Sequence, residues 1–94
     1  MDKEMLGMMA FSKAGHDKDR VYMIIDQDET YVYLCDGRLR TADKPKRKKY
    51  KHIQIIKKVS EEIRKCFEGG NKPDDIMIRK TIDEFKRHTE CYVD

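Results

Sequence analysis

The hydrophobic residues in the first half of the chain fall into short runs that polar residues separate. Three of these runs are strand-like, at Leu6–Ser12, Val21–Asp26 and Tyr31–Cys35. The polar turn Lys13–Arg20 lies between the first two. The second run is nearly continuous in β-branched, aromatic and other apolar residues, which indicates a strand with much of both faces covered. The dipeptide Asp36-Gly37 after the third run is a tight-turn signal. We interpret the stretch 7–37 as the scaffold of the fold.

Two further strands are predicted before the pattern changes. Leu39–Thr41 is a candidate for a short fourth strand, and His52–Ile56 alternates between apolar and polar residues and is the fifth. Between them, Ala42–Lys51 contains Pro45 and almost no apolar residue, so we expect a loop there. Five short strands in under sixty residues predict a small curled sheet or barrel.

Helical periodicity begins after the last of these strands. Ser60 is the predicted N-cap of a first helix, with two glutamates in the first turn where the helix dipole favours them. Val59, Ile63 and Phe67 share one face of this helix, and Gly69-Gly70 ends it.

A second helix is predicted after a short linker, with Asp74 or Asp75 as its N-cap. Ile78, Ile82 and Phe85 follow at i, i+4 and i+7 and form one apolar stripe. Packing of this stripe against the sheet is the simpler interpretation, and docking of a partner protein on it is the alternative.

Length and composition set the size of the fold. The 94 residues are enough for one domain. Of these residues, 38% are hydrophobic and 41% are charged. These values indicate a small core under a charged surface, with little room for a deep catalytic cleft. The predicted class is α+β, mainly β with C-terminal helices. The sheet or barrel occupies 1–58 and includes a basic loop at 38–51, and a helical extension at 59–94 packs on the same domain.

Charge is distributed unevenly along the chain. Met1–Gly37 has four Lys/Arg against eight Asp/Glu, whereas Arg38–Lys58 has ten Lys/Arg and a single acidic residue. Val59–Asp94 has seven Lys/Arg against nine acidic residues, so that the net charge of the whole chain is only +3. A block of this kind is typical of a surface that binds a polyanion.

The basic block suggests contacts to RNA phosphates. Eight cations stand in the fourteen positions from Arg38 to Lys51, and Tyr50 and His52 are placed to stack on an unpaired base. A solvated loop or a nuclear-import signal is the alternative interpretation. The turn Lys13–Arg20 forms a weaker second patch, and because two aspartates interleave with its cations, a plain charged turn is equally compatible with it.

The candidate RNA-binding residues are Lys13, His16, Lys18, Arg20, Arg38, Arg40, Lys44, Lys46, Arg47, Lys48, Lys49, Tyr50, Lys51 and His52.

Four pieces of the first half of the chain occur in a recognisable order: Gly7, SKAGHDKDRVY at Ser12–Tyr22, DGRLR at Asp36–Arg40 and KPKRKKYKHIQ at Lys44–Gln54. In these pieces the sequence resembles the KOW-motif family of ribosomal proteins and transcription elongation factors. The chain looks similar to small bacterial KOW-domain RNA-binding proteins that resemble the eukaryotic and archaeal large-subunit ribosomal proteins of the fourteen-e type. The matching segments cover roughly a third of the chain, all in its first half.

The resemblance implies an SH3-like barrel and RNA binding in a ribosomal context. One position departs from the pattern, because Asp19 stands where the motif turn usually carries a second glycine. Aspartate tolerates the left-handed backbone conformation better than most residues, so the turn is compatible with it. The C-terminal third of the chain lies outside the motif.

Nothing in the sequence predicts catalysis, a cofactor or a metal. No glycine-rich phosphate loop, nucleophile elbow or HExxH motif is present, and His88 with Cys91 is an isolated HxxC, too few ligands for zinc. The three cysteines are odd in number and widely spaced, which favours free thiols in a reducing compartment. Together with a charged start and no apolar stretch of membrane-spanning length, this predicts a cytoplasmic protein. We also expect the protein to be a monomer when free.

Two functions therefore remain as hypotheses. The first is an RNA-binding protein, ribosome-associated, that contacts structured RNA mainly through phosphates. The second is a protein–protein interaction module that uses the barrel or the C-terminal helix, with Ile78 or Phe85 at the interface.

Overall fold

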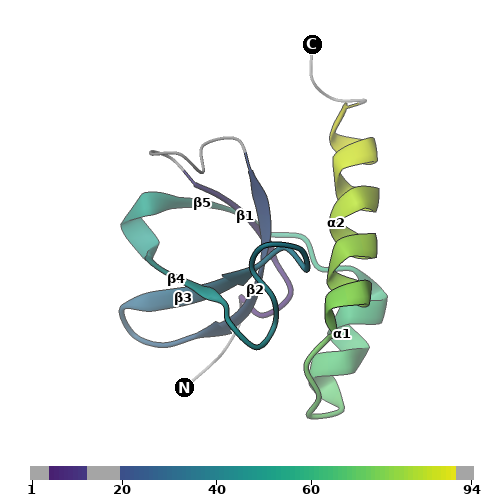
Figure 1. Cartoon of the computed structure of the whole chain (residues 1–94), viewed down its shortest axis with the longest axis horizontal. Helices are drawn as coiled ribbons and strands as arrows, with labels where there is room; N and C mark the ends of the chain where they lie inside the picture. The colour runs from purple at the N-terminus through teal and green to yellow at the C-terminus, as the bar shows by residue number, and fades with distance from the viewer. Residues whose placement is uncertain (1–4, 13–19, 91–94) are drawn as a thin grey trace.

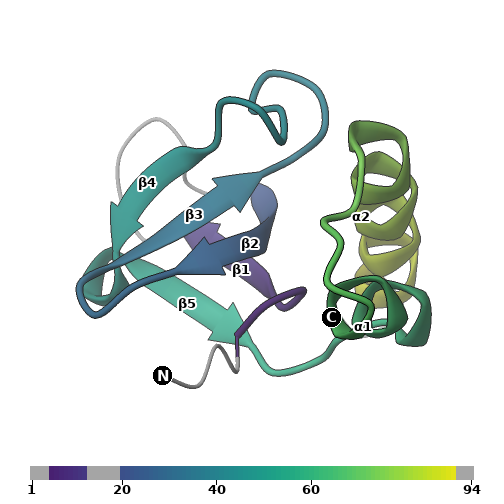
Figure 2. The ribbon, with the colours of Figure 1, turned by 90° about the horizontal axis from the view of Figure 1, so that it is seen from below.

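A five-stranded antiparallel sheet and two α-helices make up the fold, in a computed structural model that describes residues 5–12 and 20–90 (Figure 1). The elements, in chain order, are β1 (Met9–Ser12), β2 (Val21–Gln27), β3 (Tyr31–Cys35), β4 (Lys46–Lys49), the 3₁₀-helix η1 (Tyr50–His52), β5 (Ile53–Ile56), α1 (Glu61–Glu68) and α2 (Asp75–Glu90). Both helices lie on the same side of the sheet (Figure 2). The predicted α+β class is confirmed.

The strand order is β4-β3-β2-β1-β5, so β4 and β5 form the two edges of the sheet. Within residues 5–12 and 20–90 no ladder joins these two edges, and the sheet is open rather than closed into a barrel. The edges would lie about 19 Å apart in a flat sheet of this order. Only η1 connects them, and the chain from Lys49 to Ile53 spans at most about 14 Å. The sheet must therefore curl, which brings β4 and β5 toward each other at this end.

The central strand β2 supplies apolar side chains to both faces of the sheet, as the sequence predicted. Met23 and Ile25 join a cluster that includes Ile63 of α1 and Ile78 of α2, so this cluster fills the space between sheet and helices. The alternate residues Tyr22 and Ile24 belong to a second cluster on the concave face of the curled sheet. All five residues from Val21 to Ile25 are buried.

The helix signals in the sequence correspond to the observed caps. The Ser60 hydroxyl accepts a hydrogen bond from the Ile63 amide at 3.2 Å, and α1 ends at Gly69. Of the two candidate caps for α2, Asp74 is the one that accepts a hydrogen bond from a first-turn amide, that of Met77, at 2.8 Å. Both predicted N-caps are confirmed.

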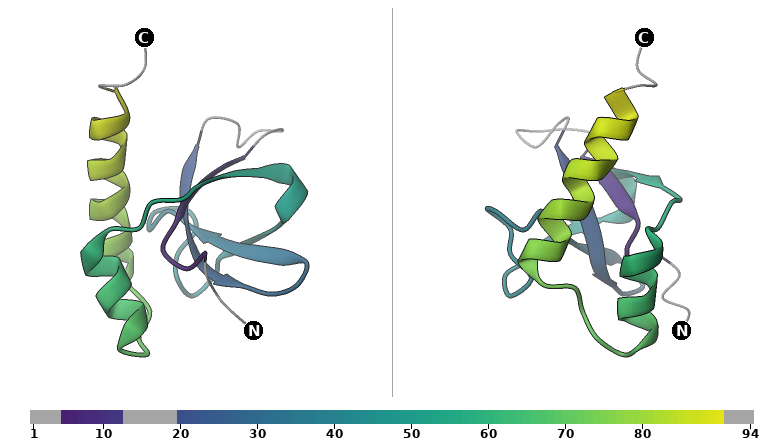
Figure 3. Two further views of the ribbon diagram at one scale, coloured as in Figure 1. Left: turned by 180° about the vertical axis from the view of Figure 1, so that it is seen from behind. Right: turned by 90° about the vertical axis from the view of Figure 1, so that its right-hand side faces the viewer.

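The predicted apolar stripe of α2 packs against the sheet. Figure 3 shows the helix lying alongside the strands. Ile78 and Ile82 are buried, and the Phe85 ring lies 6.3 Å from that of Phe11 in β1, measured between ring centroids. The interpretation of this stripe as core is confirmed. A partner protein would reach these three side chains only if α2 left the sheet.

The prediction of a strand at Leu39–Thr41 is wrong. The amides of Asp36 and Gly37 both donate to the Arg40 carbonyl, at 2.9 and 3.1 Å, and the Asp36 carboxylate accepts from the amides of Arg38 and Arg40. These bonds fold the segment into a tight turn, which leaves Leu39 74% exposed.

The prediction of a loop throughout Ala42–Lys51 is also wrong. Lys46–Lys49 forms β4, which pairs with β3 along four residues, and Tyr50–His52 forms η1. An edge strand tolerates a run of cations because their side chains reach solvent on both faces, and charge at an edge also discourages pairing with another chain. Pro45 stands just before the strand, where its missing amide costs no ladder bond.

Candidate nucleic-acid interface

The four cations of β4 project alternately to opposite faces of the sheet. Lys46 and Lys48 pair with Leu34 and Val32, both fully buried on the concave face, whereas Arg47 and Lys49 pair with tyrosines on the other face. The first two are half-buried and the second two are exposed. The basic segment therefore presents two pairs of cations, one on each side of an edge, instead of one continuous loop surface.

The concave-face pair lies close to apolar side chains. Leu34 and Val32 belong to the second core cluster, so the aliphatic stems of Lys46 and Lys48 extend over its margin. Burial lowers the pKa of the Lys46 ammonium, and the nearby charge of Lys48 lowers it further. An anion that approached this pair would relieve the repulsion between the two ammonium groups.

The outer pair includes an arginine that is already oriented. The Arg47 guanidinium lies 4.4 Å from the centroid of the Tyr31 ring, a cation–π contact between neighbouring strands. Arg47 is exposed, so the contact restrains the side chain while leaving its N–H groups open to solvent. A restrained arginine loses less conformational entropy when it binds a phosphate.

Asp28, in the turn between β2 and β3, fixes the strand ends beside this arginine. Its carboxylate accepts hydrogen bonds from the amides of Thr30 and Tyr31, at 2.9 and 2.7 Å, and from the Tyr33 hydroxyl at 2.8 Å. The two amide bonds, followed by the hydroxyl bond, hold the pKa of Asp28 below its usual value. The same carboxylate raises the pKa of the Tyr33 hydroxyl.

These bonds predict that Asp28 contributes a pH-dependent part of the stability. The folded-state pKa lies below the ordinary value of 3.8, so the stabilisation is present above that pH and is lost as pH falls through the lowered pKa. Asp28→Asn keeps an acceptor oxygen but cannot titrate. We expect its urea midpoint to fall less than that of the wild type between about pH 5 and pH 2.5.

The matched control is Asp43→Asn, which makes the same change of charge at an exposed position. Its urea midpoint should follow the wild-type pH dependence. If wild type and Asp28→Asn gave parallel curves, Asp28 would not be a titrating contributor to stability.

The three residues of η1 differ in their surroundings. The Tyr50 hydroxyl donates to the Asp28 carbonyl, and its ring packs against the second core cluster. These contacts give Tyr50 a structural role at the junction of the sheet edges, and its stacking on an RNA base stays a prediction. Lys51 and His52 are exposed on the same short helix. They lie directly after the β4 cations and extend the charged edge.

Three further candidate cations lie between β3 and β4. Arg38, Arg40 and Lys44 are all exposed. The Arg38 guanidinium forms an ion pair with Asp83 of α2, at 3.4 Å between Nη2 and Oδ2. Both side chains are about half exposed, and such surface pairs contribute little to stability.

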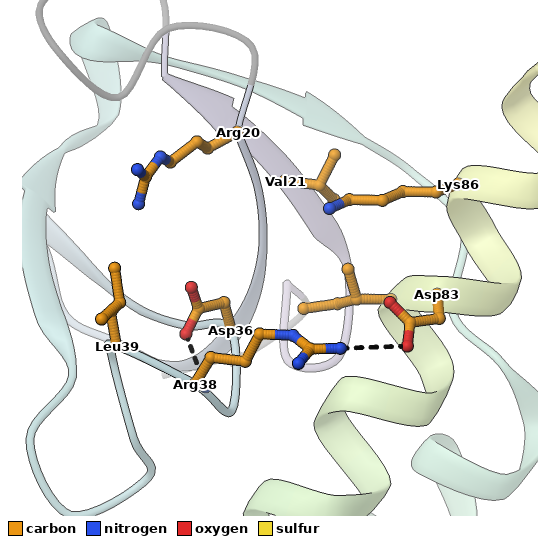
Figure 4. Close-up of a pocket in the computed structure, with 8 residues that line it drawn as sticks. Arg20, Val21, Asp36, Arg38, Leu39, Asp83 and Lys86 are labelled. Atoms are coloured by element: carbon orange, nitrogen blue, oxygen red, sulfur yellow. Dashed lines mark hydrogen bonds and ion pairs between the residues drawn. The ribbon is translucent and has the colours of Figure 1, made fainter.

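Arg38 also shares a pocket with two cations from other parts of the chain (Figure 4). They are Arg20, the residue immediately before β2, and Lys86 of α2. The three cations line one pocket, although they are far apart in the chain. Arg38 follows Arg20 by eighteen positions, and Lys86 follows Arg38 by forty-eight. Arg20 and Arg38 are among the candidates that the sequence predicts, whereas Lys86 is not. The signal for Lys86 was its position four residues after Ile82, close to the edge of the stripe that packs on the sheet.

Three candidates in the motif turn, Lys13, His16 and Lys18, lie outside the described residues, as does Asp19. The prediction that this turn binds RNA beside the basic segment stays a prediction. The HxxC pair also falls outside what is described, since the His88 side chain and Cys91 are not included.

The described residues contain no group of three or more His, Cys, Asp or Glu side chains placed to hold a metal. Cys35 is buried, and its thiol donates to the Thr41 carbonyl at 3.1 Å. Burial, with the nearby carboxylates of Asp75 and Asp36, raises the pKa of this thiol to about 12. Cys35 is therefore a packed thiol rather than a nucleophile.

Comparison of the chain with models of known protein families and with curated proteins gives no significant match. Neither α1 nor α2, as far as the structure describes them, has the length and hydropathy to cross a membrane.

Proposed function

We propose that this protein binds structured RNA, mainly through phosphate contacts, and that the charged edge formed by β4 and η1 is the principal contact surface. The observation that carries the proposal is the run of five cations and one tyrosine from Lys46 to Lys51, placed on a sheet edge with no acidic residue among them. Ladder bonds to β3 fix the backbone of β4, so its four cations project as two pairs, one on each face of the edge. Cations on both faces allow phosphates on either side of the edge to be contacted.

The proposed architecture is an SH3-like barrel, as the resemblance to the KOW-motif family implies. The strand order and the single turn of 3₁₀-helix between the two edge strands support it, because they force the sheet to curl. By the same resemblance we propose that the RNA is ribosomal and that the protein is a binding protein rather than an enzyme. We further propose that it acts in the cytoplasm, as the odd number and wide spacing of its cysteines predict, and that it is a monomer when free.

The test of this function is the salt dependence of RNA binding. Labelled fragments of structured RNA are titrated with the protein, and fluorescence anisotropy gives the affinity at several salt concentrations. With about six phosphate contacts, we expect affinity to fall by about 10³-fold between roughly 50 and 200 mM salt, because counterions released on binding must be taken up again.

A protein that shows no salt-dependent affinity for any structured RNA fragment would contradict the proposal. Affinity purification from extract with and without nuclease treatment is the complementary measurement. Partners that disappear after RNA digestion support RNA binding, whereas partners that persist at high salt support the protein-interaction hypothesis.

A further inference from the structure

A pocket lies at the junction of the sheet, the turn after β3 and the C-terminal half of α2 (Figure 4). Its apolar lining includes Val21 and Ile82, which are 7% and 3% exposed and belong to the core between sheet and helices. Arg20, Arg38 and Lys86 reach the same space from three different elements. The pocket thus combines a packed floor with a cationic rim.

The charges in the pocket do not cancel. Two carboxylates, Asp36 and Asp83, stand against the three cations. The Oδ1 atom of Asp36 is committed to the turn, since it accepts the amides of Arg38 and Arg40 at 2.8 and 2.9 Å. Asp83 forms an exposed ion pair with Arg38, which an incoming anion can replace at small cost. The site therefore attracts a negatively charged group.

The size of the pocket limits what that group can be. Its volume is about 210 Å³, whereas sites for drug-sized ligands measure roughly 300–1,000 Å³. A single tetrahedral anion with its attached sugar edge fits this space better than a whole cofactor. Arginine offers paired N–H donors to phosphate oxygens, and lysine adds a point charge.

We infer that this pocket binds one phosphate group of the RNA, so that α2 contributes directly to the RNA-binding surface through Lys86. The inference rests on the proposed function and extends it to a helix that lies outside the KOW resemblance. On binding, the Arg38 guanidinium turns from Asp83 to the phosphate, and Lys86 and Arg20 complete the contact from the other sides.

The experiment compares two variants of α2 that carry the same change of charge. Lys86→Gln removes a cation from the pocket, and Lys80→Gln removes an exposed cation of the same helix that does not line it. We expect Lys86→Gln to weaken RNA binding by roughly 3- to 10-fold and to make the salt slope shallower by about 1. Lys80→Gln should match the wild type.

A second measurement tests the pocket without RNA. Adenosine 5′-monophosphate and adenosine are each added to the ¹⁵N-labelled protein, and the amide signals of Val21, Leu39 and Asp83 are followed. We expect the monophosphate to shift these signals in the wild type and in Lys80→Gln but not in Lys86→Gln, and adenosine to leave them unchanged, because the phosphate is the recognised group.

The outcomes separate this inference from the proposed function. If RNA binds but Lys86→Gln and Lys80→Gln behave alike in both measurements, the pocket site is overturned while RNA binding by β4 stands. If no RNA binds but the monophosphate shifts depend on Lys86, the proposed function fails and the phosphate site stands. Equal shifts from adenosine, or larger ones from an oligoglutamate peptide, would overturn the assignment to phosphate.

Discussion

Replacing Lys46, Arg47, Lys48 and Lys49 together by glutamine is expected to weaken RNA binding about 100-fold at 0.15 M salt and to make the salt slope shallower by about 3. The reason is that the four side chains occupy consecutive positions of β4 and reach both sides of one sheet edge. Glutamine keeps much of the aliphatic stem that covers the second core cluster. Fluorescence anisotropy over a series of salt concentrations measures both quantities.

The matched control neutralises four exposed cations elsewhere, in Lys57→Gln, Arg64→Gln, Lys65→Gln and Lys80→Gln. Both quadruple variants lower the net charge by four, from +3 to −1, so long-range attraction falls equally in the two. Only the β4 variant should lose the steep salt dependence. Equal losses in both variants would mean that net charge, and not the edge of the sheet, determines binding. Thermal unfolding checks that each variant is folded.

Gly37→Ala is expected to destabilise the protein by about 3 kcal/mol, the largest single-residue effect that we predict. Gly37 has φ +76°, and a Cβ atom there would lie 2.5 Å from the Asp75 carbonyl oxygen and 2.7 Å from Cγ of Arg79. Alanine would therefore both strain the backbone and push the turn after β3 away from α2. A chain of this length has a total stability of about 5–14 kcal/mol, so the melting temperature should fall by about 12–24 °C.

Gly70→Ala provides the control for this substitution. Gly70 also has positive φ, +80°, but no atom lies within 4 Å of the position that a Cβ would take. It should cost only the backbone strain, about 1 kcal/mol. If the two variants melted at the same temperature, close packing of the turn against α2 would not contribute to stability.

Elements whose signals are local could be predicted from the sequence. The run Val21–Ile25 is apolar at every position, so its burial on both faces followed from composition alone. The first helix was predictable because Ser60 and Gly69-Gly70 are chemically suited to begin and end it. In each of these cases the residues that determine the structure are neighbours in the chain.

The strand β4 could not be predicted because nothing within it favours a strand. Its sequence is four consecutive cations, a residue type with low strand propensity, and its apolar partners Val32 and Leu34 belong to β3. Pairing across the sheet determines the structure here. The wrong strand prediction at Leu39–Thr41 has a related cause. Hydrogen bonds to the Asp36 side chain and to the Arg40 carbonyl hold a tight turn there, although Leu39 is apolar.

The candidate site was predictable in composition but not in arrangement. The cationic block was visible as a charge count, yet its division between two faces depends on the register of β4 with β3. Lys86 was missed because the packing of α2 on the sheet is what brings it to Arg20 and Arg38. A contact between three elements so far apart in the chain leaves no periodic pattern in the sequence.

The position of β1 has a consequence for the order in which the protein folds as it is synthesised. Although β1 comes first in the chain, it lies between β2 and β5, and Met9 pairs with Ile56. On a ribosome, β1 leaves the exit tunnel well before its second neighbour does, and the apolar face later covered by α2 stays bare longer still. Such long-range pairing slows folding compared with a helical domain of similar size. Until β5 and the two helices have emerged, the nascent chain therefore exposes the apolar faces of an incomplete sheet, which makes co-translational chaperones relevant to its yield.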